Sequence, residues 1–318
     1  IFMFFERWKM ESKNLIFEEK PSLRDPILLM AFSGWSDAAE SATEAATYLI
    51  KKYSAKRFSY IDSENYFEFS ETRPTVSLNK SGERVIDWPK IEFYYFSIPS
   101  QERDVVVGIG NEPHFNWKSF SACVLDFIKQ IKPSFTVTMG AFLSATSHLN
   151  EVTLVCLANN PKLAESIGVN ISDYEGPTGI VGVLQNIFQK NEVDSISLWG
   201  NVPHYLANVK NPKVAYTLIE KFQELSDITL DLESLKNHSE VFSRKVDDAI
   251  SKDSKLSQYV TDLDADEIVD EFFMSNEGIN LTDEDFSMDY EDELPPGDEV
   301  ANEIEELIRR KKRDSDKE

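Results

Sequence analysis

The sequence predicts an α/β fold in which a mostly parallel sheet is flanked by helices and followed by a C-terminal helical appendage and an acidic tail. Short apolar runs alternate with helical patterns, and such runs indicate strands buried on both faces. Each run also ends in a loop that contains glycine, and the carboxyl ends of parallel strands share one edge of a sheet, where ligands bind. The clearest runs are Ile27–Phe32, Val105–Val107, Phe135–Met139 and Ser195–Trp199.

In the first half of the chain, strand Ile27–Phe32 leads into a helix over Asp37–Lys52, with Ser36 as its expected N-cap and acidic residues in its first turn. A second helix is expected over Trp117–Ile131 because its apolar residues recur at 3.6-residue spacing, and Asn116 precedes it as a cap. The strands expected between these helices are Arg57–Asp62, Thr75–Leu78, Ile91–Ser97 and Asp104–Ile109.

In the second half, an Asn-Pro pair at Asn211 and Pro212 predicts a helix start, because proline is favoured at the first helical position. That helix extends to about Leu225. The elements expected before it are strands Phe135–Met139, Val152–Leu157 and Ser195–Trp199, a short helix over Pro161–Ser166 and a helix from the Gly176–Gly179 loop to about Gln189.

Strand patterns stop near Ser226, which divides the chain into an α/β core domain (1–225), a helical hairpin appendage (226–273) and an acidic flexible linker with a short terminal helix (274–318). Two amphipathic helices, Asp231–Ser251 and Lys255–Phe273, are expected in the appendage. The terminal segment is interpreted either as a partner-binding helix or as a solvated tail. Its candidate contact residues are Val300, Ile304, Leu307 and Ile308.

The charge of the chain, −23, is concentrated in one window. Val260–Val300 holds sixteen acidic residues and no lysine or arginine, so the rest of the chain sums to −7. This balance disfavours nucleic acid as a partner. No stretch approaches the ~20 apolar residues of a membrane span, so no membrane partner is expected. Cys123 and Cys156 lie in apolar stretches and are expected to be buried thiols, which fits a cytoplasmic location.

No complete catalytic or cofactor motif appears in the sequence. Gly108 and Gly110 follow a strand as a dinucleotide fingerprint would, but Pro113 occupies the position of the third glycine, which favours a tight turn. Neither a phosphate-binding loop ending in Gly-Lys-Ser/Thr nor a Gly-x-Ser-x-Gly nucleophile elbow is present. We therefore expect no cofactor, no metal and no assignable catalytic residue.

Polar residues and glycines at the strand ends form a candidate rim or ligand pocket. His114 and His148 join this edge with His204, Asp37, Glu112 and Glu175 as an acid–base or metal cluster; the alternative is that these groups cap turns. Arg73 is either an anion clamp or a structural salt-bridge partner. The rim residues are Gly34, Trp35, Asp37, Arg73, Gly110, Glu112, Gly140, Glu175, Gly176, Thr178 and His204.

An ordered series of short segments resembles the proteasome assembly chaperone 2 family in its actinobacterial form. The resemblance covers roughly residues 27–225, and the series as a whole carries it rather than any single motif. The segments are Phe32–Ala39, Thr72–Val76, Gly110–Pro113 with Trp117, Gly140–Leu143, Tyr174–Gly179 and Val202–Tyr205. It implies a fold like that of the nucleoside phosphorylases, a homo-oligomer such as a trimer, and proteasome subunits as partners. The hydrophobic–Tyr–any ending that some relatives use for docking is not matched by Asp314–Glu318, and Tyr290 lies far from the end.

Two functions follow from these observations. The preferred interpretation is a non-enzymatic, cytoplasmic interaction protein with a proteasome-related chaperone or adaptor role. The alternative is a small-molecule binder or enzyme of nucleoside phosphorylase or hydrolase type. In that case Arg73 would hold an anion, while Glu112, Glu175 and His204 would hold or protonate a substrate. Few basic residues lie beside the strand ends, which disfavours the alternative.

Overall fold

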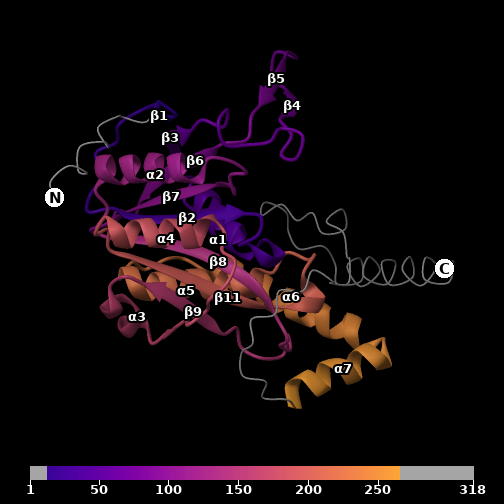
Figure 1. Cartoon of the computed structure of the whole chain (residues 1–318). Coiled ribbons are helices and arrows are strands. Elements are labelled where there is room, and N and C mark those ends of the chain that lie inside the picture. The colour runs from indigo at the N-terminus through magenta and orange to yellow at the C-terminus, as the bar shows by residue number, and fades with distance from the viewer. Residues whose placement is uncertain (1–12, 266–318) are drawn as a thin grey trace.

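A nine-stranded mixed sheet with helices on both faces forms the body of the computed structural model, which describes residues 13–265 (Figure 1). Its strands are β1 (Leu15–Phe17), β2 (Ile27–Ser33), β3 (Lys56–Ile61), β6 (Ile91–Ser97), β7 (Asp104–Asn111), β8 (Thr136–Ser144), β9 (Leu154–Ala158), β10 (Asn170–Ile171) and β11 (Ser195–Pro203). The order across the sheet is β1-β3-β6-β7-β2-β8-β11-β9-β10. The four central strands, β7, β2, β8 and β11, are parallel and correspond to the four apolar runs that end in glycine-bearing loops.

The α/β fold class is confirmed, and the outer strands give the sheet its mixed character. β6 pairs antiparallel with β7 and with β3, β3 pairs antiparallel with β1, and β9 pairs antiparallel with β11. A short loop connects β6 to β7, and a connection of that length allows only an antiparallel neighbour. Apolar periodicity does not encode the direction of a strand, so this part of the topology was outside what the sequence pattern predicts.

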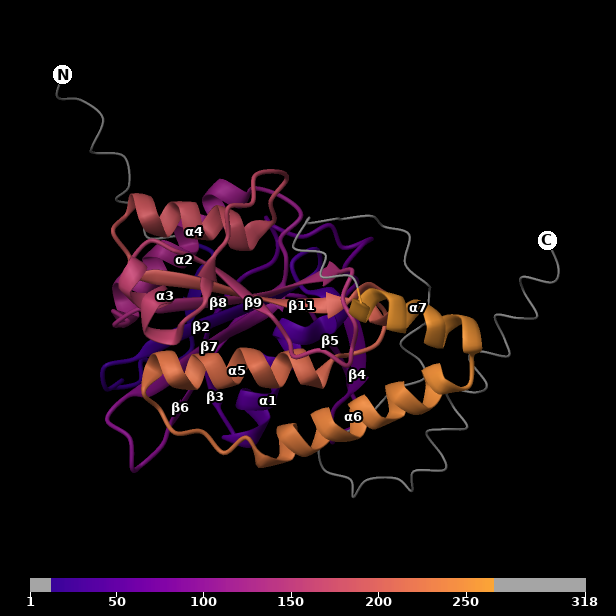
Figure 2. The same cartoon turned by 90° about the horizontal axis from the view of Figure 1, so that it is seen from below.

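Two helical layers cover the sheet (Figures 1 and 2). The helices are α1 (Ser41–Lys52), α2 (Trp117–Ile131), α3 (Pro161–Ile167), α4 (Ile180–Lys190) and α5 (Pro212–Ser226). Alternate residues of β2 point to opposite faces: Ile27, Leu29 and Ala31 pack with α1, α3 and α5, while Leu28 and Phe32 pack with α2 and α4. Because both faces are covered, β2 needs apolar residues at every position.

The helix starts differ in how their first amides are capped. Asn211 caps α5 as predicted, with its side-chain oxygen accepting from the amides of Lys213 and Val214. Ser36 does not cap α1: its hydroxyl is buried without a hydrogen-bond partner, and a 3-10 turn separates it from the helix. Asn116 precedes α2 but makes no cap bond there.

The appendage contains α6 (Glu233–Ser251) and α7 (Ser254–Ala265), which confirms two helices after the core. They pack on the 3-10 turn His204–Leu206 that follows β11 (Figure 2). The expected continuation to Phe273, the acidic linker and the four candidate tail residues lie outside the described residues, and the division into three domains stays a prediction. No helix within 13–265 is long and apolar enough to cross a bilayer. The cluster that joins appendage and core comprises Tyr205, Leu206, Val209, Phe242, Val246, Ile250 and Val260.

A separate two-stranded hairpin projects from the body (Figure 1). It consists of β4 (Thr75–Leu78), which the sequence predicted, and β5 (Arg84–Asp87), which it did not. The hairpin lies in the connection between β3 and β6. Since β6 begins beside the carboxyl end of β7, the hairpin leaves the body at the edge where the central parallel strands end.

Candidate functional site

Asp37, just after β2, is a buried helix cap. The side chain is 6% exposed, and its Oδ1 accepts from the backbone amide of Ala42 at 2.6 Å and from that of Thr43 at 3.3 Å. The Thr43 hydroxyl donates to Oδ2. Burial raises the pKa of Asp37 to about 6, against the opposing effect of these hydrogen bonds. Asp37 therefore satisfies the first amides of α1, the role that the sequence assigned to Ser36.

Glu112, after β7, caps a different helix. Its Oε1 accepts from the backbone amide of Ile180, the first residue of α4, at 2.6 Å, and the carboxylate also accepts from the amide of Trp35. Burial raises its pKa. A Cβ at Gly179 would lie 2.7 Å from Glu112 Oε1 and 3.0 Å from the ring of Trp35, so only glycine allows the carboxylate to reach α4.

These two carboxylates lie at two helix N-termini of the rim. The N-terminus of a helix is a ready anion site because its first amides lack partners within the helix. In this chain Asp37 occupies first-turn amides of α1, and Glu112 occupies the first amide of α4. Arg73, Glu175 and Thr178 are exposed on loops. The two carboxylates disfavour a phosphate at these two helix N-termini, which counts against the phosphorylase alternative.

The three histidines of the predicted cluster do not gather at one site. His114 Nδ1 accepts from the amide of Glu68 at 2.8 Å, which caps a turn. His204 lies 2.8 Å from the hydroxyl of Tyr259 and 3.3 Å from the carbonyl of Ser144. Within 13–265 no three histidine, cysteine or acidic side chains gather as a metal site. His204 instead joins the end of β11 to α7.

His148 links the core to α6. Its Nε2 lies 2.8 Å from Asp247 Oδ1, and its Nδ1 lies 2.7 Å from the hydroxyl of Tyr205. The ring is buried, which lowers its pKa despite the carboxylate of Asp247. A neutral ring that donates from Nε2 and accepts at Nδ1 satisfies both contacts.

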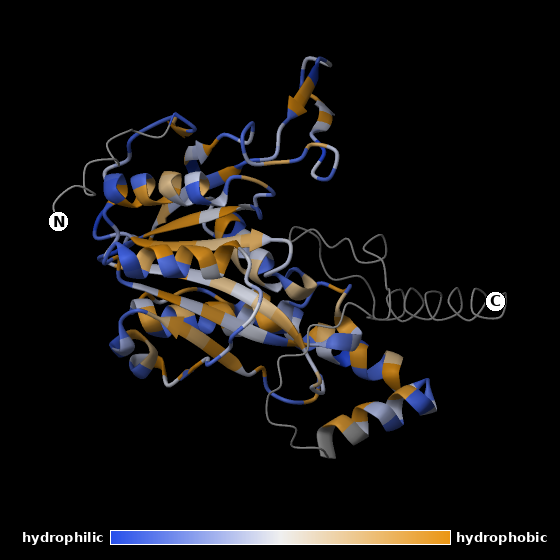
Figure 3. Ribbon diagram, in the orientation of Figure 1, coloured by the Kyte–Doolittle hydropathy of each residue, from blue (hydrophilic) through white to orange (hydrophobic). Residues whose placement is uncertain are grey.

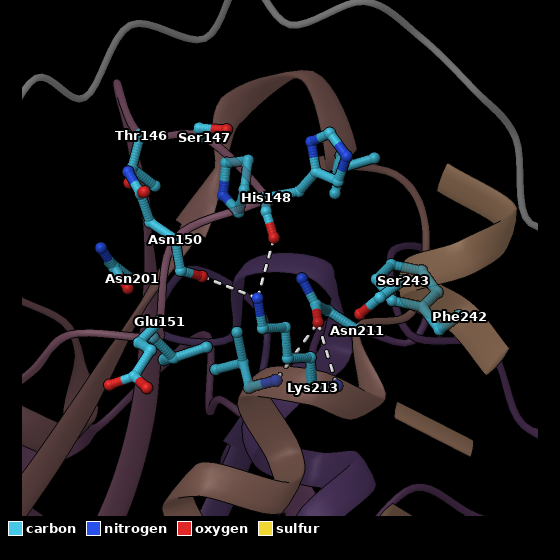
Figure 4. Close-up of a pocket in the computed structure, with 14 residues that line it drawn as sticks. Thr146, Ser147, His148, Asn150, Glu151, Asn201, Asn211, Lys213, Phe242 and Ser243 are labelled. Atoms are coloured by element: carbon cyan, nitrogen blue, oxygen red, sulfur yellow. Dashed lines mark hydrogen bonds between the residues drawn. The ribbon is translucent and has the colours of Figure 1, made fainter. Parts of the chain in front are cut away.

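A pocket beside His148 contains a lysine that the sequence analysis did not single out (Figure 4). Lys213 donates from Nζ to the carbonyls of His148 at 2.8 Å and Asn150 at 2.7 Å, and burial lowers its pKa. This lysine fixes the loop after β8 rather than pointing freely into the pocket. A lysine in the first turn of a helix carries no sequence signal for this contact, because its partners are backbone carbonyls 65 and 63 residues away.

The glycines of the rim allow close packing. A Cβ at Gly140, in β8, would lie 2.6 Å from the ring of Trp199 on β11. A Cβ at Gly110, at the end of β7, would lie 2.5 Å from the carbonyl of Lys90. Gly34 has a φ of +119° in the turn before Asp37, and Gly176 lies exposed in the loop before α4. Gly140 and Gly110 thus allow neighbouring segments of the sheet to approach closely, whereas Gly34 and Gly176 belong to a turn and a loop.

Apolar side chains, in contrast, are exposed at this edge. Nine of the ten large hydrophobic residues that are exposed among residues 13–265 lie on loops or elements at the carboxyl ends of the central strands or on the hairpin that leaves there; the tenth is Ile171 on β10. Exposed apolar residues that form a contiguous patch are typical of interaction surfaces. We call these nine the carboxyl-edge residues: Trp35, Val76, Leu78, Val85, Ile86, Trp88, Phe115, Leu149 and Tyr259.

Comparison with known proteins identifies a matching family and solved structures of similar fold. The model of the PAC2 family matches residues 31–250. A PAC2 family protein from Streptomyces avermitilis is 33% identical, with 74% of this chain and 100% of that chain covered and a TM-score of 0.69. A proteasome-assembly chaperone homologue from Mycobacterium tuberculosis is 30% identical over 74% of this chain and 99% of its own, with a TM-score of 0.67.

More distant structures share the fold. An archaeal proteasome activator from Pyrococcus furiosus is 22% identical, with 75% of this chain and 100% of that chain covered and a TM-score of 0.59. No curated protein matches the chain.

Proposed function

Because the chain belongs to the PAC2 family, we propose that it is a non-enzymatic interaction protein that acts as a chaperone or adaptor for proteasome subunits. The relative from Mycobacterium tuberculosis, described as a proteasome-assembly chaperone homologue, supports this assignment. Cys123 and Cys156 are both buried and form no disulfide, which supports a cytoplasmic location.

One observation carries the proposal: the buried carboxylates and His204 at the carboxyl edge are bound to the protein itself, whereas several apolar side chains there are exposed. The carboxylates of Asp37 and Glu112 bind helix amides, and His204 binds α7. Trp35, 41% exposed, and Phe115, 49% exposed, remain accessible on the same edge. Aromatic side chains of this kind dominate the energetics of protein interfaces, whereas a catalytic site needs polar groups with unsatisfied capacity.

The acidic C-terminal region supplies a second expected contact. The segment 274–318 and its apolar residues lie outside the described part of the chain. We propose that it binds a proteasome subunit as a short amphipathic helix, through the contact residues Val300, Ile304, Leu307 and Ile308.

The test is cross-linked capture of proteasome subunits from the source cell. Four baits are compared: the full chain, the chain without residues 274–318, Trp35→Gln with Phe115→Gln, and Ile171→Gln. Ile171→Gln is the matched control, because Ile171 is an exposed apolar residue that does not lie at the carboxyl edge. We expect the truncation and the double variant each to reduce capture at least about tenfold, equivalent to one or two interface contacts, and the control to leave it unchanged. Absence of proteasome subunits above background with the full chain would overturn the proposal.

A further inference from the structure

The hairpin β4–β5 has an apolar face that is open to solvent. Residues opposite each other across an antiparallel pair lie on the same face, and neighbours along a strand alternate. Val76 pairs with Ile86 and Leu78 pairs with Arg84, so these four share a face. Val76 is 57% exposed, Leu78 68% and Ile86 56%, and Figure 3 shows the hydrophobic colour on the projecting hairpin.

The hairpin lacks the third strand that such a small sheet needs. Its strands have four residues each, and among residues 13–265 they pair only with each other. An isolated pair of strands is marginally stable in water, whereas three strands with an apolar face can be stable. The tip is nevertheless ordered, because Asn79 Oδ1 accepts from the amides of Ser81 and Glu83, both at 2.9 Å. The hairpin is therefore a shaped but incomplete sheet.

The charges of the hairpin favour an acidic occupant. Lys80 lies at the tip and Arg84 on the apolar face, and both are exposed. Neither forms an ion pair with any residue that the structure describes. The acidic side chains of the hairpin have local partners, since Asp87 pairs with Lys90 and Glu83 accepts from the side chain of Asn79. A complementary strand would combine apolar side chains with carboxylates.

The chain contains such a segment outside its described part. Residues 283–293 hold seven acidic side chains and no basic one. Within them Phe286, Met288 and Tyr290 alternate with Ser287 and Asp289, and this period of two residues is typical of a strand with one apolar face. The alternating stretch is also about as long as β4 and β5.

The connection is long enough to join this segment to the hairpin of the same molecule. The hairpin and α7 lie at opposite ends of the body in Figure 1. Phe286 follows Ala265, the last residue of α7, by 21 residues, which extend to roughly 70 Å. A compact body of this size has a radius of gyration of about 18 Å and measures roughly 45–50 Å across. The segment can therefore pass around the body.

We propose that residues 286–290 add to the β4–β5 hairpin of the same molecule as a third strand. Phe286, Met288 and Tyr290 extend the apolar face of the hairpin, and the flanking carboxylates lie near Lys80. The docking concerns the purified chain and is independent of the proposed proteasome role. Its consequence for the tail does rest on that role: residues 298–312 would start from the carboxyl edge, beside the surface proposed to contact proteasome subunits.

The first experiment measures amide hydrogen exchange of residues 75–87 in the purified full chain. We expect exchange at least about tenfold slower than in the chain without residues 274–318, because a third strand stabilises a marginal hairpin. Replacing Phe286, Met288 and Tyr290 together by serine keeps every charge and should abolish this protection. Equal exchange in the full and truncated chains, or protection that survives the triple replacement, would overturn the proposal.

Two controls belong to this measurement. Replacing Val300, Ile304 and Leu307 together by serine removes apolar residues elsewhere in the tail and should leave the hairpin protected. An equal loss of protection in this control would show that residues 286–290 are not the docking segment. Protection should also be independent of protein concentration, because both partners belong to one molecule. Protection that falls on dilution would assign the third strand to another copy and refute docking within one chain.

The second experiment identifies the contact by carbodiimide cross-linking, which joins a lysine amine to a carboxylate that touches it. We expect Lys80 to be joined to a carboxylate of residues 283–293. In a mixture of isotope-labelled and unlabelled protein, both halves of this product should come from the same chain. Lys162, exposed on α3, is the matched control and should give no such product. A product as abundant from Lys162 as from Lys80, or none from Lys80, would contradict the assigned contact.

Discussion

The buried carboxylate of Asp37 should make the stability of the chain depend on pH in a defined direction. Its pKa is raised from 3.8 to about 6 in the folded state. The folded protein therefore binds a proton at Asp37 more tightly than the unfolded chain does. The contribution of this proton to the free energy of unfolding is fully present below pH 3.8 and is lost as the pH rises through about 6. The full shift corresponds to about 3 kcal/mol at neutral pH, and the part lost between about pH 5 and about pH 8 is about 1.4 kcal/mol.

Replacing Asp37 by asparagine removes the titration but keeps an oxygen that can accept from the amide of Ala42. We expect the wild type to lose about 1.4 kcal/mol relative to Asp37→Asn from about pH 5 to about pH 8. Urea denaturation of both proteins at several pH values, followed by tryptophan fluorescence, measures this difference. Asp173→Asn, which exchanges an exposed carboxylate for an amide, is the control. A difference between wild type and Asp37→Asn that does not change with pH, or one of opposite sign, would refute the argument from burial.

Three further changes test other contacts. Glu112→Ala should destabilise the protein by about 1–2 kcal/mol because the amide of Ile180 loses its acceptor, and Glu112→Gln should cost less; thermal unfolding measures both. Gly140→Ala should cost about 1–3 kcal/mol because its Cβ meets the ring of Trp199, which denaturant titration would show as a lowered midpoint. Burial lowers the pKa of His148, so its contribution to the free energy of unfolding is complete above pH 6.5 and declines as the pH falls below that value. Amide hydrogen exchange in α6, corrected for intrinsic rates, should therefore become faster as the pH falls below 6.5 in the wild type. In His148→Gln the corrected exchange rate should not change over this range.

The central sheet could be predicted because its sequence signal is local. β2 and β7 are buried on both faces, and a run of consecutive apolar residues records that burial directly. β8 and β11 are also buried, but in them serine or threonine alternates with apolar residues in the first half of the strand. The direction of β6 and β9 depends on the length of their connections and on which strand each pairs with. The alternation of side chains along a strand carries no information about either. β5 was missed because Arg84–Asp87 places two charges around two apolar residues and its partner strand is only four residues long.

The candidate site shows the same division between local and distant partners. Asn211 could be identified as a cap because the amides that it binds are two and three residues away. Glu112 binds the amide of Ile180 68 residues further along the chain, and only the packing of α4 against the end of β7 brings them together. The residues of the rim could therefore be predicted from the sequence. Whether a carboxylate there is free to bind a ligand or is already bound to the backbone could not.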